Sequence, residues 1–259
     1  MKINGIQIAK TKQVRSCKIC STPSPLYGNV DFNKNCESIR GLVLPEAHIL
    51  IGYNKCPRCG FLFTSAFDKW GHEQFGKAIY NDDYILVDPD YKEARPANNA
   101  AMLTSAFGAA RSSLSVLDYG GGNGILADTL VRNKFQSATT YDPFNSEYAT
   151  LPDRRFNIVS CFETLEHVAD PSQQVTDIAK CVDEVGIVVF STLLQPPDID
   201  KIGLAWWYAG PRNGHISLFS RVALAEVWRQ QGFRIASFND NLHIAYQKVP
   251  AFAQHLIPG

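Results

Sequence analysis

Residues 116–124 decide the fold and read Val116-Leu117-Asp118-Tyr119-Gly120-Gly121-Gly122-Asn123-Gly124. A short apolar run, typical of a buried strand, leads directly into a turn with four glycines, and a helical stretch follows. Glycine lets the backbone bend sharply and lets a ligand approach where a β-carbon would collide. The N-terminus of the next helix adds free N–H groups. The stretch therefore predicts a ligand site at the carboxyl end of a strand.

Strands and helices alternate on both sides of this loop, which predicts a parallel sheet with crossover helices. We expect strands at residues 115–119, 138–141, 157–161, 185–192, 233–238 and 242–247, and helices at 98–112, 125–133, 171–182 and 221–231. The last two strands are separated only by Asn239-Asp240-Asn241, so they form a hairpin. The fold class is therefore α/β, a Rossmann-like doubly wound sheet with an antiparallel last strand.

The loop resembles motif I of the class I methyltransferases, in which a strand ends in an acid and leads into G-x-G-x-G. Gly120, Gly122 and Gly124 fit the glycine positions, and the resemblance implies that Asp118 lies near the methionine part of S-adenosylmethionine. Nicotinamide-binding Rossmann domains use a related turn. Asp142 stands 18 residues past Gly124, at the end of the next expected strand, where a carboxylate suits the ribose hydroxyls.

Residues 156–168 resemble the fourth strand of the same family with its E-x-L-E-H segment, here Glu163 to His167. One departure is the 13 residues between Asp142 and Phe156, too few for the usual helix and third strand. We expect that strand to be vestigial and that helix to be lost. The residues of the adenine pocket therefore stay open, with three candidates: Leu151, Asp153 and Phe162.

Composition indicates an ordinary globular protein, since 25 basic residues balance 25 acidic ones. Zero net charge argues against a surface that tracks phosphate backbones, so we do not expect a nucleic-acid partner. With no apolar run long enough for a membrane span, we expect no membrane association and a cytoplasmic location. Three zones differ in composition: a zinc-ribbon lobe at 1–65, an aromatic and acidic linker or lid at 66–97, and the S-adenosylmethionine-dependent methyltransferase domain at 98–259.

Four of the seven cysteines form two C-x-x-C pairs, Cys17 with Cys20 and Cys56 with Cys59. Each pair supplies two thiolates from a tight turn, as a structural tetrahedral zinc site requires. The 35 residues between the pairs are unusually many, so replacement of a ligand by Cys36 or His48 stays open. The other two cysteines, Cys161 and Cys181, lie in apolar stretches and are expected to pack in the core.

The candidate catalytic residues are His215, Glu163 and His167. His215 lies in an aromatic loop after the fifth strand, at the edge where ligands bind. It either acts as a base or substrate contact, or only bonds a nearby carbonyl and orders the loop. His167 either caps a helix or takes part in catalysis, and Glu163 ends the fourth strand. The candidate substrate contacts are Tyr80, Tyr84, Tyr208 and Arg212. Packing between lobes for Tyr80 and Tyr84, and a surface ion pair for Arg212, are the alternatives.

The resemblance implies a methyltransferase that uses S-adenosylmethionine and a structural Zn²⁺ and acts on a polar small molecule, with a sugar or surface-polysaccharide precursor as the first expectation. Zinc ribbons before such a domain resemble deoxysugar C-methyltransferases and certain ribosomal-RNA guanine methyltransferases. In the sugar enzymes a Glu precedes the matching His. Here Gly214 takes that place, which favours oxygen over carbon as acceptor. RNA methylation, which the five positive charges of residues 1–20 keep open, and a non-catalytic scaffold are the alternatives. The sequence does not determine the oligomeric state.

Overall fold

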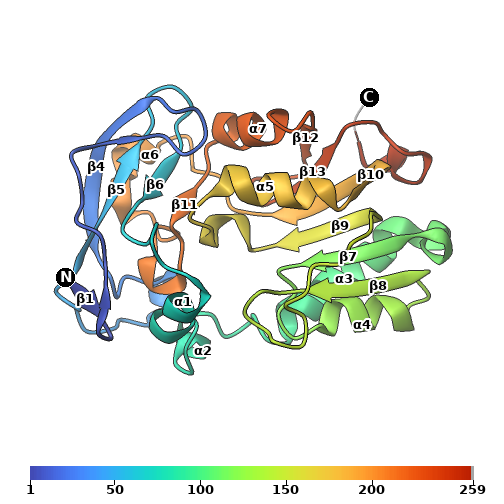
Figure 1. Cartoon of the computed structure of the whole chain (residues 1–259), viewed down its shortest axis with the longest axis horizontal. Coiled ribbons are helices and arrows are strands. Elements are labelled where there is room, and N and C mark those ends of the chain that lie inside the picture. The colour runs from blue at the N-terminus through green and yellow to red at the C-terminus, as the bar shows by residue number, and fades with distance from the viewer. Residues whose placement is uncertain (258–259) are drawn as a thin grey trace. The chain divides into compact units, whose positions relative to one another are not determined.

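Two units make up the chain in the computed structural model, which describes residues 1–257 (Figure 1). Unit 1 contains Met1–Pro89, Leu165–Ser172 and Leu193–Val227, and unit 2 contains the remaining segments. Neither unit is one continuous segment of the chain, because the chain passes from one unit to the other several times. The boundaries expected near residues 65 and 97 remain predictions.

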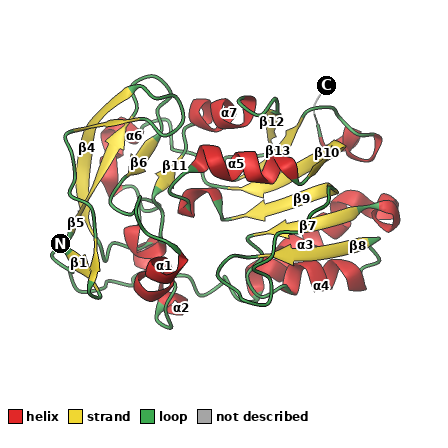
Figure 2. Ribbon diagram, in the orientation of Figure 1, coloured by secondary structure: helices red, strands yellow, loops and turns green. Residues whose placement is uncertain are grey.

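Unit 2 is built around a six-stranded sheet in the order β12-β13-β10-β9-β7-β8 (Figures 1 and 2). Its strands are β7 (Ser115–Tyr119), β8 (Ser137–Tyr141), β9 (Phe156–Phe162), β10 (Val182–Ser191), β12 (Arg234–Ser237) and β13 (Leu242–Tyr246). Its helices are α3 (Ala94–Phe107), η2 (Gly108–Ser113), α4 (Ile125–Arg132), α5 (Pro171–Lys180), which begins in unit 1, and η6 (Ala251–Leu256). β8, β7, β9 and β10 are parallel, and β13 is antiparallel to both β10 and β12. The expected doubly wound sheet with its antiparallel last strand is confirmed.

No strand or helix lies between β8 and β9 in the part of the chain that the structure describes. The expected loss of the helix is confirmed, and the third strand, which we expected to be vestigial, is absent there altogether. Both faces of the central strands are buried. Val116, Ile158 and Ile187 belong to the apolar core that α3 and α4 cover, while their neighbours Leu117 and Val159 are equally inaccessible. Strands buried on both faces explain why these runs are continuously apolar rather than alternating.

Unit 1 contains a five-stranded sheet in the order β11-β6-β5-β4-β3. Its elements are β1 (Lys2–Ile3), β2 (Ile6–Gln7), β3 (Val14–Ser16), β4 (Pro23–Asp31), η1 (Cys36–Arg40), β5 (Leu50–Lys55), β6 (Leu62–Thr64), α1 (His72–Ala78), α2 (Tyr84–Val87), η3 (Leu165–His167), α6 (Ile199–Ile202), η4 (Gly203–Ala205), η5 (Pro211–Asn213), β11 (Ser217–Leu218) and most of α7 (Arg221–Arg229). The two-residue strand β11 pairs antiparallel with β6 and was not expected from the sequence. It brings the loop that carries His215 into the N-terminal sheet.

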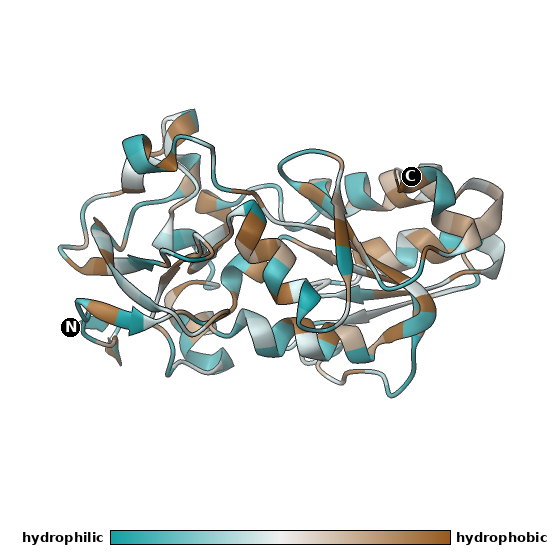
Figure 3. Ribbon diagram, turned by 90° about the horizontal axis from the view of Figure 1, so that it is seen from above, coloured by the Kyte–Doolittle hydropathy of each residue, from teal (hydrophilic) through white to brown (hydrophobic). Residues whose placement is uncertain are grey.

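The helices carry apolar and polar bands side by side, as the alternating brown and teal along them in Figure 3 shows. In α4, for example, Leu126, Ala127 and Leu130 are buried while Arg132 is exposed. Such a pattern fits helices that cover a core on one side and meet water on the other. Within residues 1–257, none of the helices combines the length and the apolar character that crossing a membrane requires.

Candidate functional site

The glycine loop lies at the carboxyl end of β7, in unit 2, and one of its glycines is required by its neighbours. A β-carbon added to Gly121 would lie 2.2 Å from Oδ2 of Asp118 and 2.8 Å from the Thr140 side chain. Real contacts at such distances do not occur, so residue 121 must be glycine for the loop to keep this path. The missing β-carbon therefore lets the loop pack directly on the Asp118 carboxyl group and the Thr140 side chain beneath it.

Asp142 holds the loop in place at the end of β8. Its Oδ2 accepts a hydrogen bond of 2.8 Å from the backbone N–H of Gly122, and its Oδ1 accepts one of 2.8 Å from the N–H of Phe144. A carboxylate has about four lone-pair sites, so two acceptor positions are still unused by these bonds. The carboxylate can thus bind two further hydroxyl donors without leaving the loop.

Asp118 is buried beneath the same loop, with 3% of the residue exposed. Burial raises its pKa to about 7, the hydrogen bond from Ser160 Oγ opposes this rise, and the nearby charge of Asp142 adds to it. The Ser160 bond to Oδ1 measures 2.9 Å. Asp118 is therefore a carboxyl group that gains or loses a proton near neutral pH.

Glu163 occupies a strained position at the carboxyl end of β9, with a φ of 48° that non-glycine residues rarely adopt. Ser191, at the end of β10, fixes it twice. The Ser191 Oγ accepts a bond of 2.9 Å from the Glu163 N–H and donates one of 2.6 Å to Glu163 Oε1. The neighbouring Phe162 packs against the apolar core of unit 2. Its expected contact with adenine remains a prediction, as do those of Leu151 and Asp153.

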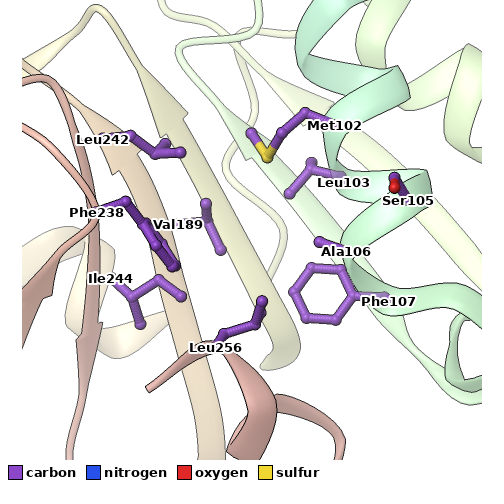
Figure 4. Close-up of a pocket in the computed structure, with 10 residues that line it drawn as sticks. All are labelled: Met102, Leu103, Ser105, Ala106, Phe107, Val189, Phe238, Leu242, Ile244 and Leu256. Atoms are coloured by element: carbon purple, nitrogen blue, oxygen red, sulfur yellow. The ribbon is translucent and has the colours of Figure 1, made fainter. Parts of the chain in front are cut away.

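Unit 2 also contains an apolar cavity of about 340 Å³ between α3, β10, β13 and η6 (Figure 4). Its lining includes Met102 and Phe107 from α3, Val189 from β10 and Ile244 from β13. Ser105 contributes the lining's one side-chain hydroxyl, so the lining is almost entirely hydrocarbon. Asp118, Asp142 and Glu163, the polar residues at the edge of the sheet, do not line this cavity.

The four cysteines of the two C-x-x-C pairs come together in unit 1, with all four sulfurs within 4.8 Å of one another. The Sγ atoms of Cys17 and Cys59 are 3.6 Å apart, and Sγ of Cys20 lies 3.4 Å from that of Cys56 and 3.7 Å from that of Cys59. Tetrahedral zinc with Zn–S bonds of about 2.3 Å separates its sulfurs by about 3.8 Å. The cluster therefore fits zinc closely.

The two knuckles have the same backbone form. The residue after each second cysteine, Ser21 or Gly60, has a positive φ (59° and 74°) and donates its N–H to the carbonyl of the first cysteine. Cys36 lies elsewhere, 3.5 Å from the Nδ1 of His215, and His48 is exposed beside Glu46. Neither of these two residues replaces a cysteine in the cluster. The expected burial of Cys161 and Cys181 is confirmed.

His215 is the centre of a buried polar cluster in unit 1. Its Nδ1 lies 2.8 Å from the carbonyl oxygen of Tyr208, and its own carbonyl accepts a bond of 2.7 Å from the Tyr53 hydroxyl. Because a carbonyl only accepts, Nδ1 must carry the proton, which leaves the lone pair of the neutral ring on Nε2. The His167 ring lies 4.9 Å from the His215 ring, measured between centroids.

Glu166 joins this cluster although sequence reasoning did not assign it to the site. It is fully buried, and its Oε1 accepts a hydrogen bond of 2.6 Å from the Tyr208 hydroxyl. Tyr208 therefore orients both Glu166, through its side chain, and His215, through its backbone. Its place directly before the candidate residue His167, in the segment Leu165-Glu166-His167-Val168, was the signal that marked Glu166.

Three of the four expected substrate residues are almost completely buried in unit 1: Tyr84, Tyr208 and Arg212. Arg212 donates to the carbonyl of Ile79 at 2.8 Å and to Oδ1 of Asn81 at 3.1 Å. The Tyr84 hydroxyl donates to the carbonyl of Asn213 at 3.3 Å. These bonds order the segment around Tyr80, whose half-buried ring lies 6.0 Å from that of His167. Contact of the four residues with a substrate remains a prediction.

Comparison with protein families identifies the family of the chain. The family model described as a methyltransferase domain (Methyltransf_23) matches residues 91–237, more than half of the chain. The chain belongs to this family. The methyltransferase domain thus includes the glycine loop, Asp142 and Glu163, together with the loop of His215.

Relatives of the methyltransferase domain carry the name ubiquinone biosynthesis O-methyltransferase. One, from Neisseria meningitidis, is 32% identical over 107 residues, which cover 32% of this chain and 45% of that protein. Another, from Klebsiella pneumoniae, is 31% identical over 117 residues, which cover 36% and 46%. The chain thus spans less than half the length of these relatives. The solved structure of a 1,6-didemethyltoxoflavin N1-methyltransferase from Burkholderia thailandensis matches with 13% identity and a TM-score of 0.46, over 78% of this chain and 96% of that one.

The residues at the edge of the sheet fit S-adenosylmethionine. A β-carbon at position 121 would collide with Asp118 and Thr140 beneath the loop, so the loop keeps the close path of its backbone only with glycine there, and Asp142 has unused acceptor capacity for two ribose hydroxyls. Gly121, which sequence reasoning did not include among the binding residues, is the loop position most tightly constrained by contacts. Its place in the middle of three consecutive glycines was the signal that marked it.

Proposed function

We propose that the chain transfers a methyl group from S-adenosylmethionine to a hydroxyl oxygen of a polar small molecule. When bound, this cofactor supplies an electrophilic methyl group on a sulfonium. In this proposal the carboxylate of Asp142 binds the ribose hydroxyls, while the glycine loop lets the cofactor approach its backbone. Asp118, beneath the loop, contributes a carboxyl group close to the amino-acid end.

The single observation that carries the acceptor chemistry is the bond between Nδ1 of His215 and the carbonyl of Tyr208, 2.8 Å long. It fixes the tautomer in which Nε2 holds a lone pair. A hydroxyl becomes a better nucleophile as its proton leaves, and in this proposal Nε2 takes that proton while the oxygen takes the methyl group. Histidine suits this task because its ordinary titration range lies near neutral pH.

Oxygen as the acceptor atom is supported by two further points. Gly214 stands where the sugar C-methyltransferases resembled by this sequence have a glutamate, and the curated relatives are O-methyltransferases by name. A sugar or sugar nucleotide remains the first substrate class to test. We propose Glu163 and His167 as further polar groups that contact cofactor or substrate.

The experiment measures methyl transfer by the zinc-loaded protein to a panel of sugar nucleotides, free sugars and catechols. His215→Asn is the test variant, because the amide keeps a donor for the Tyr208 carbonyl but has no counterpart of Nε2. We expect turnover to fall by about 10²–10⁴-fold, the usual contribution of a general base, while S-adenosylmethionine binding is retained. His72→Asn, at the start of α1, is the matched control and should keep full activity.

Two results would reject the proposal. Undiminished turnover in His215→Asn would remove the base role. Transfer to carbon or nitrogen acceptors together with none to oxygen would remove the acceptor assignment.

A further inference from the structure

Unit 1 brings together a second group of side chains of the kind that bind metal ions. One ligand atom from each of Glu166, His167 and His215 lies within 4.8 Å of the other two. We name this group the His–Glu triad, and it shares no residue with the four-cysteine cluster. Two imidazoles and one glutamate are a known donor set for zinc, in sites that keep one coordination position open. The triad therefore has the ligand types of a divalent-metal site.

Backbone bonds hold the two halves of the His–Glu triad side by side. The turn η3 contributes the first two members, and the loop before β11 contributes the third. The N–H of Ile216 donates to the carbonyl of Glu166 at 2.8 Å, and the hydroxyl of Ser217 donates to the carbonyl of Val168 at 2.7 Å. Because β11 is also paired with β6, both segments are fixed by the sheet of unit 1. The triad is therefore assembled by the fold itself.

The groups behind two of the ligands orient them as in a metal site. The Nδ1–H of His215 donates to the carbonyl of Tyr208 at 2.8 Å, and the Tyr208 hydroxyl donates to Oε1 of Glu166 at 2.6 Å. Metal-binding histidines almost always donate their other ring N–H to a carbonyl or carboxylate, and metal-binding carboxylates are hydrogen-bonded in turn. Tyr208 supplies both bonds, so this supporting layer is present in the chain.

Burial and spacing also suit a cation. Glu166 is fully buried, His215 is almost fully buried and His167 is half-buried, so an ion would enter along the His167 ring. A carboxylate removed from water favours a positive charge beside it. Zinc with bonds of about 2.0–2.2 Å separates its nitrogen and oxygen ligands by about 3.4 Å, so small side-chain rotations close the triad on an ion. Cys36 lies 3.5 Å from Nδ1 of His215, on the nitrogen that Tyr208 engages, and is not a ligand here.

We infer that the His–Glu triad binds a second metal ion, a divalent ion of the zinc type. Imidazole with carboxylate suits zinc, cobalt and nickel, whereas Mg²⁺ and Ca²⁺ prefer oxygen ligands throughout. Three ligands that carry one negative charge hold zinc less tightly than four thiolates. The chain therefore loses this ion first on dialysis and keeps the ion of the four-cysteine cluster.

The consequence for catalysis rests on the proposed function. An ion on Nε2 of His215 occupies the lone pair that otherwise takes the proton of the acceptor hydroxyl. The proton and the metal ion therefore compete for this nitrogen. The triad without metal is the active form, and an excess of zinc inhibits methyl transfer.

The binding test uses the dialysed full chain, with zinc in the four-cysteine cluster, and titrates it with Co²⁺ and with Zn²⁺. Cobalt on thiolates gives strong charge-transfer absorption, whereas cobalt on nitrogen and oxygen gives only weak visible bands. We expect a second ion per chain, with weak visible bands and no new thiolate absorption, and calorimetry to give its affinity. Mg²⁺ is the comparator and should not displace the cobalt.

Two variants remove ligands from the His–Glu triad. Glu166→Gln keeps an acceptor for the Tyr208 hydroxyl, and His167→Asn removes an imidazole. Each should weaken binding of the second ion at least about tenfold, because loss of even a group behind a ligand typically costs about 10- to 100-fold in metal affinity. The melting temperature and the zinc of the four-cysteine cluster show whether the variants are folded.

The chain offers a matched control on its surface. His48 is exposed, and its Nδ1 lies 3.4 Å from Oε2 of Glu46, so this pair has an imidazole and a carboxylate but no third ligand. His48→Asn should leave the binding of the second ion unchanged. A loss of that ion in His48→Asn would overturn the assignment to the triad.

The inference is also overturned if no second ion binds, if cobalt binds only with thiolate absorption, or if both folded ligand variants bind like the unaltered chain. Methyl transfer that continues while the triad is filled would refute the competition at Nε2. Binding is measured without cofactor or acceptor. Its failure therefore counts against the metal site alone, whereas absence of methyl transfer in the dialysed chain counts against the proposed function alone.

Discussion

Oδ2 of Asp118 lies 2.2 Å from the point where a β-carbon of residue 121 would stand. The side chain of Asp118 thus allows only glycine at position 121. A single added methyl group must move either the carboxylate, which is buried, or the loop that Asp142 anchors through Gly122.

The first prediction follows directly. Gly121→Ala should weaken S-adenosylmethionine binding by at least about tenfold, because the loop has to move to make room for the added methyl group. Calorimetric titration measures this. Gly76→Ala in α1 is the control, since a β-carbon there meets nothing within 4 Å, and it should bind normally. Equal affinity of the two variants would contradict the loop geometry.

The second prediction concerns metal. Cys20→Ser should lower the zinc content of the purified protein below one ion per chain and lower its melting temperature, because a structural zinc stabilises the fold that binds it. Metal analysis and thermal unfolding check this. Cys161→Ser, which alters a buried cysteine of β9, is the control, and it should lose stability but keep its zinc. Full zinc in Cys20→Ser would reject the four-cysteine site.

The third prediction is a pH dependence carried by Asp118. Its pKa in the folded chain is about 7, against an ordinary 3.8. Between these two values the folded chain keeps a proton that the unfolded chain releases, so the free energy of unfolding falls as pH rises and levels off above about pH 7. From pH 5 to pH 8 the fall is on the order of 3 kcal/mol.

Urea unfolding at pH 5 and pH 8 measures this effect. Asp118→Asn has no proton to lose, so its stability relative to the unaltered chain should rise between the two pH values. Asp198→Asn replaces an exposed carboxylate and should show no such rise. If the free energies of unfolding of Asp118→Asn and of the unaltered chain change by the same amount between pH 5 and pH 8, the raised pKa of Asp118 is refuted.

The fourth prediction separates two roles of Arg212. Arg212→Met removes the donors to the carbonyl of Ile79 and to Asn81, and should lower the free energy of unfolding by about 1–3 kcal/mol. Arg40→Met, at an exposed arginine paired with Glu37, should change it little. If Arg212→Met raises the KM for the acceptor and leaves stability unchanged, Arg212 contacts substrate instead of ordering the segment around Tyr80.

Local patterns in the sequence were sufficient to predict most of unit 2. Strands buried on both faces leave uninterrupted apolar runs, and the short stretch between Asp142 and Phe156 has too little length for a crossover. The contacts of the polar cluster in unit 1 were beyond such reasoning. The Tyr208 hydroxyl bond to Glu166 joins residues 42 positions apart, and the Tyr53 bond to the carbonyl of His215 joins residues 162 apart.

The cavities and the strand β11 were missed for a related reason. Ser217 and Leu218 form only a two-residue strand, which carries no periodicity to recognise. A cavity lined by the end of β4, by η1 and by the loop after it depends on how Asp31 fixes a loop whose residues are individually unremarkable polar and aliphatic types. Patterns of hydrophobicity report faces of elements, whereas cavities result from the packing of several elements at once.

The pairing of β11 with β6 also has a consequence for biosynthesis. The edge of the N-terminal sheet formed by Leu62 and Phe63 stays open until Leu218 and Ser217 have been synthesised and released from the ribosome. The growing chain therefore carries this unpaired edge through the production of about 150 further residues, a period in which strand edges are prone to pair with other chains. Completion of the N-terminal sheet is thereby a late event in translation, although its first strands are made early.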